Sequence, residues 1–149
     1  MKKEYMDLAF FYAQKAFDEN EVPIGAVIVK GDNVISFGYN LKEKNQSVLD
    51  HAELIAIREA EKIINNWRLD DCDLYVTLDP CPMCASAIKQ ARIKNVYSAG
   101  SNLDVDNRKI IEKIFDKDKV NPGVSFYYDL DVDQSKTILN SFFKRQRNK

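Results

Sequence analysis

One histidine, one glutamate and two closely spaced cysteines limit most strongly what this chain can fold into. His51 is the only histidine among 149 residues, and Glu53 follows it by two positions. Cys81 and Cys84 come later, on either side of Pro-Met. Imidazole and thiolate groups are ligands that proteins use for zinc. The fold is therefore expected to bring these distant residues together.

The two cysteines are expected at the start of a helix. Pro80 and Pro82 flank Cys81, and proline is favoured just inside a helix start. Cys81 and Cys84 are three positions apart, so both sulfurs would lie on one face of this helix. The free amide groups and positive dipole end of a helix start favour thiolates, which are the form that binds metal.

His51 is expected at the start of a second helix, over residues 52–64. If the strand predicted at 73–78 delivers the cysteines beside that helix start, one nitrogen and two sulfurs can surround a zinc ion. Three protein ligands leave the fourth position for water, which is the open arrangement of catalytic zinc. Glu53 is then expected to move protons as general base and general acid, with a pKa raised by a partly dry pocket. These parts suit hydrolytic loss of ammonia from an amidine-like ring carbon.

Two other interpretations of the cysteines are open. Cys72 could complete a structural Cys3His site, but it precedes the strand, and six extended residues carry the chain about 20 Å away. Cys81 and Cys84 could also form a thioredoxin-like redox pair. The upstream His-x-Glu favours zinc over both, and Cys72 is expected to be a partly buried structural side chain.

The apolar pattern predicts an α/β fold in one domain over residues 1–149, because no repeat, low-complexity tract or linker divides the chain. Strands alternate with helices after a hairpin, which predicts a mixed five-stranded sheet with helices on both faces and parallel strands in its second half. The expected strands are residues 26–30, 34–39, 73–78, 94–99 and 124–128, and the expected helices lie near 5–17, 52–64, 82–91, 107–115 and from 134 onward.

Composition excludes several classes of protein. Three cysteines are too few for a secreted disulfide framework, and no apolar stretch approaches the roughly 18 residues of a membrane span. We therefore expect a cytoplasmic protein with no membrane contact. The chain has 22 basic and 23 acidic residues, so binding to nucleic acid would need a local basic patch. The visible candidate is the stretch 144–149.

Several segments resemble the bacterial tRNA adenosine deaminases, a branch of the zinc-dependent cytidine/deoxycytidylate deaminase superfamily. H-x-E with P-C-x-x-C is the known signature of zinc nucleobase deaminases. The segments similar to the branch are EVPIGAVIV, GYN, HAELIAI, NWRLDDCDLYVTLDPCPMCASAI, ARIKNVY and the terminal FFKRQR. The resemblance implies a cytidine-deaminase-like three-layer α/β/α sandwich, usually a homodimer, with one zinc ion per chain. It also implies conversion of the wobble adenosine in a tRNA anticodon loop to inosine.

The resemblance further implies a set of substrate contacts. Asn40 would contact the nucleoside, backbone around Ala52 and Pro80 to Cys81 would shape the pocket, and Asn102 would help to receive RNA. The wall around the base would come from Val22, Pro23 and Ile24. The alternatives are that Asn40 is a turn residue ending the hairpin and that residues 22–24 are ordinary core. An anticodon loop offers unpaired bases that leave their stack at low cost.

The end of the chain combines aromatic and basic side chains that could contact RNA. These are Phe142, Phe143, Lys144, Arg145 and Arg147. Adjacent phenylalanines on a helix face different ways, so at least one is expected in the core. A solvated, frayed end is the alternative.

Two departures from the branch stand out. Asp79 replaces the usual glutamate, and GSNLDVDNRK lacks the usual glycines while Asp104 and Asp106 add negative charge. These changes bear on RNA docking and leave open a deaminase of free guanine or cytosine. A third possibility, from another class of protein, is a zinc-stabilised binding module without catalysis.

Overall fold

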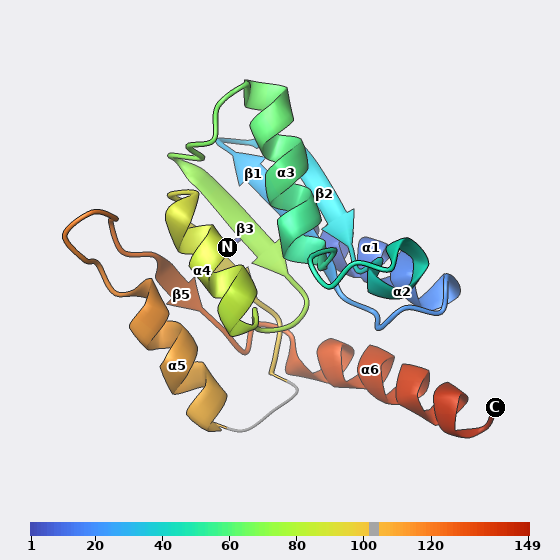
Figure 1. Ribbon diagram of the computed structural model, residues 1–149. Coiled ribbons are helices and arrows are strands. Elements are labelled where there is room, and N and C mark those ends of the chain that lie inside the picture. Colours follow the sequence, from blue (N-terminus) through green and yellow to red (C-terminus); the bar gives the residue numbers. More distant parts are fainter. Residues whose placement is uncertain (102–104) are drawn as a thin grey trace.

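The computed structural model describes residues 1–101 and 105–149, and within them a mixed sheet runs in the order β2-β1-β3-β4-β5 (Figure 1). β1 is antiparallel to both β2 and β3, while β3, β4 and β5 are parallel to one another. The predicted hairpin, mixed sheet and parallel second half are confirmed. The strands are β1 (Gly25–Lys30), β2 (Asn33–Tyr39), β3 (Cys72–Val76), β4 (Asn95–Ser98) and β5 (Ser125–Tyr127).

Helices cover both faces of this sheet, as predicted. Figure 1 shows α3, α4 and α5 in front of the strands and α1 behind them. Alternate residues of a strand point to opposite faces, so Ile28 packs in the core beneath α3 and α4 while Val27 packs beneath α1. The helices are α1 (Lys3–Asp18), α2 (Lys42–Asn45), α3 (Ala52–Ile64), α4 (Pro82–Gln90), α5 (Val105–Phe115) and α6 (Val132–Arg147). None of the helices in the described ranges is long and apolar enough to cross a bilayer.

The short helix α2 lies between the strand expected at 34–39 and the helix expected at 52–64, in a segment for which no helix was predicted. Its first amide groups are bound by a residue far away in sequence: the carboxylate of Glu21 accepts from the N–H groups of Glu43 and Lys44 at 3.0 and 2.7 Å. Glu21 is buried. A carboxylate at a helix start satisfies donors that the helix cannot, and this partner is invisible to a local pattern.

The start of α3 lies very close to β2, because β2 has no side chain at Gly38. A Cβ atom at this position would lie 2.8 Å from the backbone nitrogen of Ala56 and closer still to the carbonyl oxygen of Ala52. Ser36, on the same strand, donates its hydroxyl to the carbonyl of Ala56 at 2.7 Å. The sheet thus determines where α3 begins, and His51 stands at that point.

Candidate metal centre and active site

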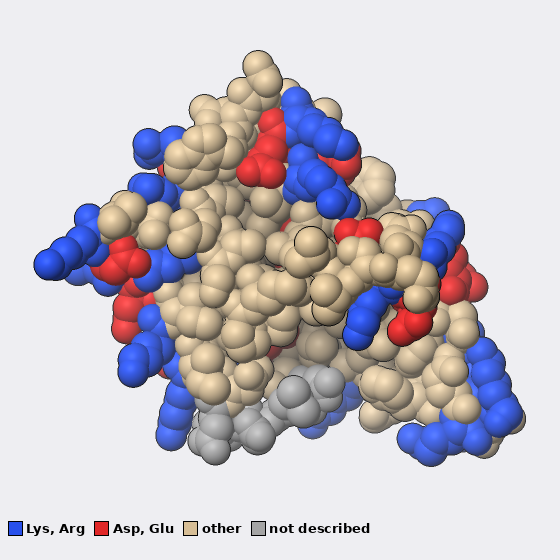
Figure 2. Space-filling view, in the orientation of Figure 1, with Lys and Arg blue, Asp and Glu red and all other residues tan. Residues whose placement is uncertain are grey.

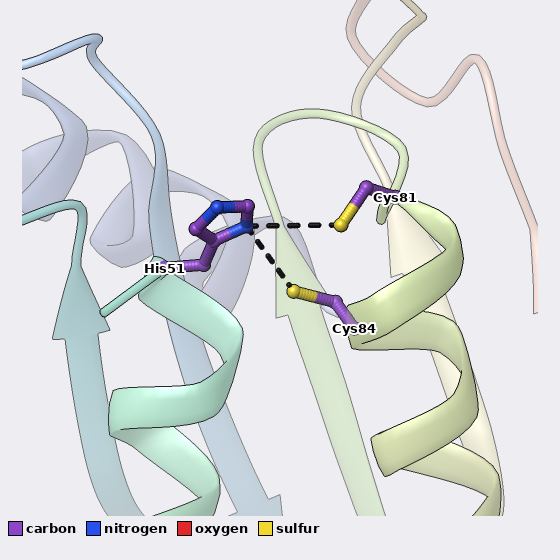
Figure 3. Close-up of side chains that lie close together, drawn as sticks. All are labelled: His51, Cys81 and Cys84. Carbon is purple, nitrogen blue, oxygen red and sulfur yellow. Dashed lines mark hydrogen bonds between the residues drawn. The ribbon is translucent and has the colours of Figure 1, made fainter. Parts of the chain in front are cut away.

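His51, Cys81 and Cys84 converge on one point between the starts of α3 and α4 (Figure 3). His51 is the N-cap residue of α3, and Cys81 is the N-cap residue of α4. The His51 Nδ1 atom lies 3.7 Å from Cys81 Sγ and 3.4 Å from Cys84 Sγ. Around a tetrahedral zinc ion with bonds of about 2.3 Å to sulfur and about 2.0 Å to nitrogen, such ligands lie about 3.5 Å apart. The donor set and its spacing therefore fit zinc.

Cys72 takes no part in this cluster. Among the described residues, the group of histidine, cysteine and acidic side chains close enough to share a metal comprises His51, Cys81 and Cys84. Cys72 is fully buried in the hydrophobic core at the start of β3, whereas the cluster follows the end of that strand. Its structural role was predicted, although we expected only partial burial.

The thiols of Cys81 and Cys84 have different pKa values. A hydrogen bond from the Cys84 thiol, with backbone N–H groups of Cys84 and Met83, lowers the pKa of Cys81 to about 5. The same interaction, together with burial, raises the pKa of Cys84. Without a metal the pair therefore holds one proton, which a binding cation would displace because cysteine binds metal as the thiolate.

Glu53 lies in the first turn of α3 and is only 4% exposed. Burial raises its pKa to about 7, and the negative charge of Cys81 acts in the same direction. The charge of a bound cation would act in the opposite direction. A carboxyl group that titrates near neutral pH can both accept and donate a proton, which is what general acid–base catalysis requires.

A pocket of about 140 Å³ opens at this cluster. Three of the residues proposed to act there, His51, Glu53 and Cys81, line it, and so does Ile24 from the expected base wall. It is smaller than the roughly 300–1,000 Å³ of most small-molecule sites, so it suits part of a substrate, such as a single base. Four further residues line the pocket that were not predicted as site residues, namely Leu78, Asp79, Ser101 and Asn107.

Asn40 directly follows β2, and both polar atoms of its side chain form hydrogen bonds with the backbone. Its Nδ2 atom donates to the carbonyl of Val22 at 3.3 Å, and its Oδ1 atom accepts from the backbone N–H of Lys42 at 3.2 Å. Asn40 is not among the residues that line the pocket. In this geometry it holds the segment before β1, which carries Ile24, against the loop after β2.

The other expected contacts surround the site to different degrees. Ala52 and Pro80 are buried next to His51 and Cys81, and Pro23 is buried beside Ile24. Asn102 and Asp104 lie outside the described residues, as does the side chain of Asp106.

The C-terminal helix divides its candidate RNA contacts between core and surface. Phe142 is buried and packs against Phe17, which confirms that one phenylalanine belongs to the core. Arg145 donates to the carbonyl of Phe17 at 2.7 Å, with its guanidinium 4.0 Å from the centre of that ring. Phe143, Lys144 and Arg147 are exposed. Lys and Arg gather over this end of α6 (Figure 2), and its attachment to α1 argues against a frayed end.

Comparisons with known proteins agree with this geometry. The sequence matches the MafB19-like deaminase family over residues 1–147. It is 39% identical to the tRNA-specific adenosine deaminase of Aquifex aeolicus, over 99% of this chain and 98% of that protein. A structure from work on A-to-I editing by tRNA:A34 deaminases at the wobble position of transfer RNA is similar with a TM-score of 0.84 at 35% identity. That likeness covers 93% of this chain and 100% of the other.

A guanine deaminase from Bacillus subtilis is a second structural relative. It is 33% identical with a TM-score of 0.66, over 100% of this chain and 96% of that one. The likeness to the tRNA:A34 deaminase confirms the expected cytidine-deaminase-like α/β/α fold. The family match and the full-length relatives together show that this chain belongs to the deaminase family, in the group of the tRNA-specific adenosine deaminases.

Proposed function

We propose that this protein is a zinc-dependent enzyme that converts the wobble adenosine of a tRNA anticodon loop to inosine and releases ammonia. The observation that carries the proposal is the convergence of His51, Cys81 and Cys84 beside the buried carboxyl of Glu53. Relatives named for this activity align along nearly the whole chain, which supports adenosine in tRNA as the substrate. Residues 1–149 would act as one deaminase domain.

His51, Cys81 and Cys84 would hold one zinc ion through Nδ1 and two sulfurs. The bound cation supplies the Lewis acidity that makes water a nucleophile near neutral pH. Glu53 accepts a proton from the attacking water and delivers it to the purine ring next to the reacting carbon. It then moves the second proton of the water to the amino group, and the carbon–nitrogen bond breaks to release ammonia.

The pocket would admit the base alone and leave the sugar and phosphates outside. Ile24 would form its wall, with Val22 and Pro23 behind it in the same segment. Asn40 would contact the nucleoside from the position where it now holds this segment. The backbone around Ala52 and Pro80 would complete the pocket, and Asn102 would help to receive the RNA.

RNA outside the pocket would meet the basic end of α6. Phe143 is 39% exposed and can stack on a base, while Lys144 and Arg147 can contact phosphates. Phe142 and Arg145 would act indirectly, by attaching this helix to α1. The near-neutral total charge means that the contact depends on this local patch.

We also propose a homodimer that works in the cytoplasm, where its tRNA substrate is found. Exposed apolar side chains near the end of α3, Ile63 and Trp67, supply a candidate surface at 66% and 55% exposure. Light scattering after gel filtration tests this state, and a monomer at micromolar concentration would contradict it.

A deaminase of free guanine is the main alternative, and one observation favours it. The guanine deaminase structure is nearly as identical to this chain as the tRNA:A34 deaminase structure is, at 33% against 35%. Both activities would use the same zinc ligands and the same acid–base carboxylate. Sequence identity alone does not separate them.

The deciding experiment compares substrates directly. Zinc-loaded protein is incubated with an anticodon stem-loop RNA that carries adenosine at the wobble position, and inosine is measured. The same protein is incubated with free guanine, cytosine and adenosine, and ammonia is measured. We expect inosine in the RNA and little ammonia from the free compounds; robust turnover of free guanine with inert RNA would contradict the proposal.

A further inference from the structure

Arg108 connects three segments around the pocket, and the reaction described above gives it no role. It lies in α5 directly after Asn107, which lines the pocket. Its Nε atom donates to Asp79 at 2.9 Å, and its two terminal nitrogens donate to Asp129 at 3.1 and 2.8 Å. Its guanidinium also lies 3.9 Å from the centre of the Tyr128 ring. Such use of the planar guanidinium fork is specific to arginine.

The two carboxylates that Arg108 binds differ in burial. The side chain of Asp79 is 5% exposed and that of Asp129 is 48% exposed. An exposed ion pair contributes little because solvent screens it, whereas loss of one partner from a buried pair leaves an unpaired charge. Of the two ion pairs, the one between Arg108 and Asp79 therefore contributes more to holding the two residues and their backbone segments in position.

Asp79 lies both in the pocket wall and in the loop that leads from β3 to Cys81. Its carboxylate accepts from the hydroxyl of Ser98 at 2.6 Å, and its backbone N–H donates to the carbonyl of Gly100 at 2.9 Å. β4 and the residues after it thus hold one side of Asp79, and α5 holds the other through Arg108. A shift of Arg108 would move the pocket wall.

We infer that Arg108 is a positioning residue that sets the pocket wall formed by Asp79 and Asn107, and so determines how tightly the base is bound. This rests on the proposed function in one respect, namely that a base occupies the pocket.

The test compares Arg108→Gln with the matched control Asp129→Asn, which removes only the exposed half of the contact. For the substrate that the wild type turns over best, we expect Arg108→Gln to raise KM at least about tenfold, with kcat changed less than about threefold. Asp129→Asn should change either constant less than about twofold, as expected of an exposed pair. Zinc content should stay at one per chain in both variants.

A double-mutant cycle shows whether the effect acts through Asp79. Asp79→Asn combined with Arg108→Gln should raise KM no more than Arg108→Gln alone, because both changes remove the same interaction. Additive effects on KM would overturn the inference. A lower melting temperature with unchanged KM in Arg108→Gln would also overturn it, since a merely structural residue behaves in that way.

The substrate panel separates this inference from the proposed function. If the wild type turns over free guanine and not RNA, the tRNA proposal fails, but the KM ratio for guanine still tests Arg108. If Arg108→Gln does not fold, Arg108→Lys replaces it, because lysine keeps the charge and loses the fork. An unchanged KM in Arg108→Lys would then overturn the inference.

Discussion

Replacing Gly38 by alanine tests whether the contact between β2 and α3 sets the geometry of the catalytic site. The added Cβ atom would lie 2.8 Å from the backbone nitrogen of Ala56, about 0.6 Å less than the 3.4 Å at which ordinary contact begins. Both obstructing groups belong to the backbone of α3, so no side chain can rotate away. The start of α3 must move, and it carries His51 and Glu53 with it.

The expected losses of kcat and of stability in Gly38→Ala can be estimated from this displacement. The carbonyl oxygen of Ala52 lies closer to the added Cβ atom than the Ala56 nitrogen does, so α3 must shift by more than the 0.6 Å that the nitrogen requires. A misplacement of about 1 Å can cost about 100-fold in rate, so kcat should fall about 10- to 100-fold. Overpacking costs about 1–3 kcal/mol of unfolding free energy. For a chain of this length, that corresponds to a fall in melting temperature of about 2–12 °C.

The assay measures kcat at saturating stem-loop RNA, zinc content and thermal unfolding for Gly38→Ala and for the control Gly31→Ala. Gly31 has a φ of +61° in the hairpin turn, and nothing lies within 4 Å of an added Cβ atom. Alanine there costs about 1–2 kcal/mol through its left-handed backbone but does not touch α3. We expect similar stability losses and a fall in kcat only for Gly38→Ala. A kcat within twofold of the wild type for Gly38→Ala would refute the reasoning.

Four further predictions follow from the site and the core. Glu53→Gln should keep its zinc and lose at least about 100-fold in kcat, because the acid–base group is gone; activity near the wild-type level would instead support a non-catalytic binding module. Metal analysis should find one zinc per chain in Cys72→Ser and a clear loss in Cys84→Ser, whereas zinc loss in Cys72→Ser would restore the Cys3His interpretation. Chelation should abolish activity and lower the melting temperature while the far-ultraviolet circular dichroism stays native, since the core is built without the metal; unfolding on chelation would show otherwise. Arg145→Ala should cost about 1–3 kcal/mol of unfolding free energy, as its charged hydrogen bond to α1 is lost, and the exposed Lys144→Ala should cost none; equal costs would contradict the role given to Arg145.

The predicted elements agree with the structure wherever a short stretch of sequence carries the signal. Apolar spacing located α3, the prolines that flank Cys81 located the start of α4, and the turn at Gly31 located the hairpin. The helix α2 was not predicted, because the amide groups at its start are bound by the carboxylate of Glu21, which precedes β1. A partner so far away in the sequence does not affect the local residue pattern from which helices are predicted.

The same distinction holds at the active site. The convergence of Cys81 and Cys84 could be predicted from their spacing, because residues three positions apart at a helix start lie on one face. His51 stands at the start of another helix, and only the fold brings it to the two sulfurs. The hydrogen bonds of Asn40 could not be predicted from spacing. Its side-chain amide joins the backbone at Val22 to the backbone at Lys42, and these two segments come together only in the folded chain.

The sequence by itself predicted the order of the helices and strands other than α2, and it indicated His51, Glu53, Cys81 and Cys84 as candidate site residues, because each signal lies in residues a few positions apart. Only the tertiary structure decided that these separate signals meet, which other groups line the pocket and which residues hold them. Arg108 meets Asp79 and Asp129 across 29 and 21 positions of chain, and Arg145 meets Phe17 across 128. Such pairs form because the packing of helices on the sheet brings distant parts of the backbone together. Local residue propensities do not predict which distant parts will meet.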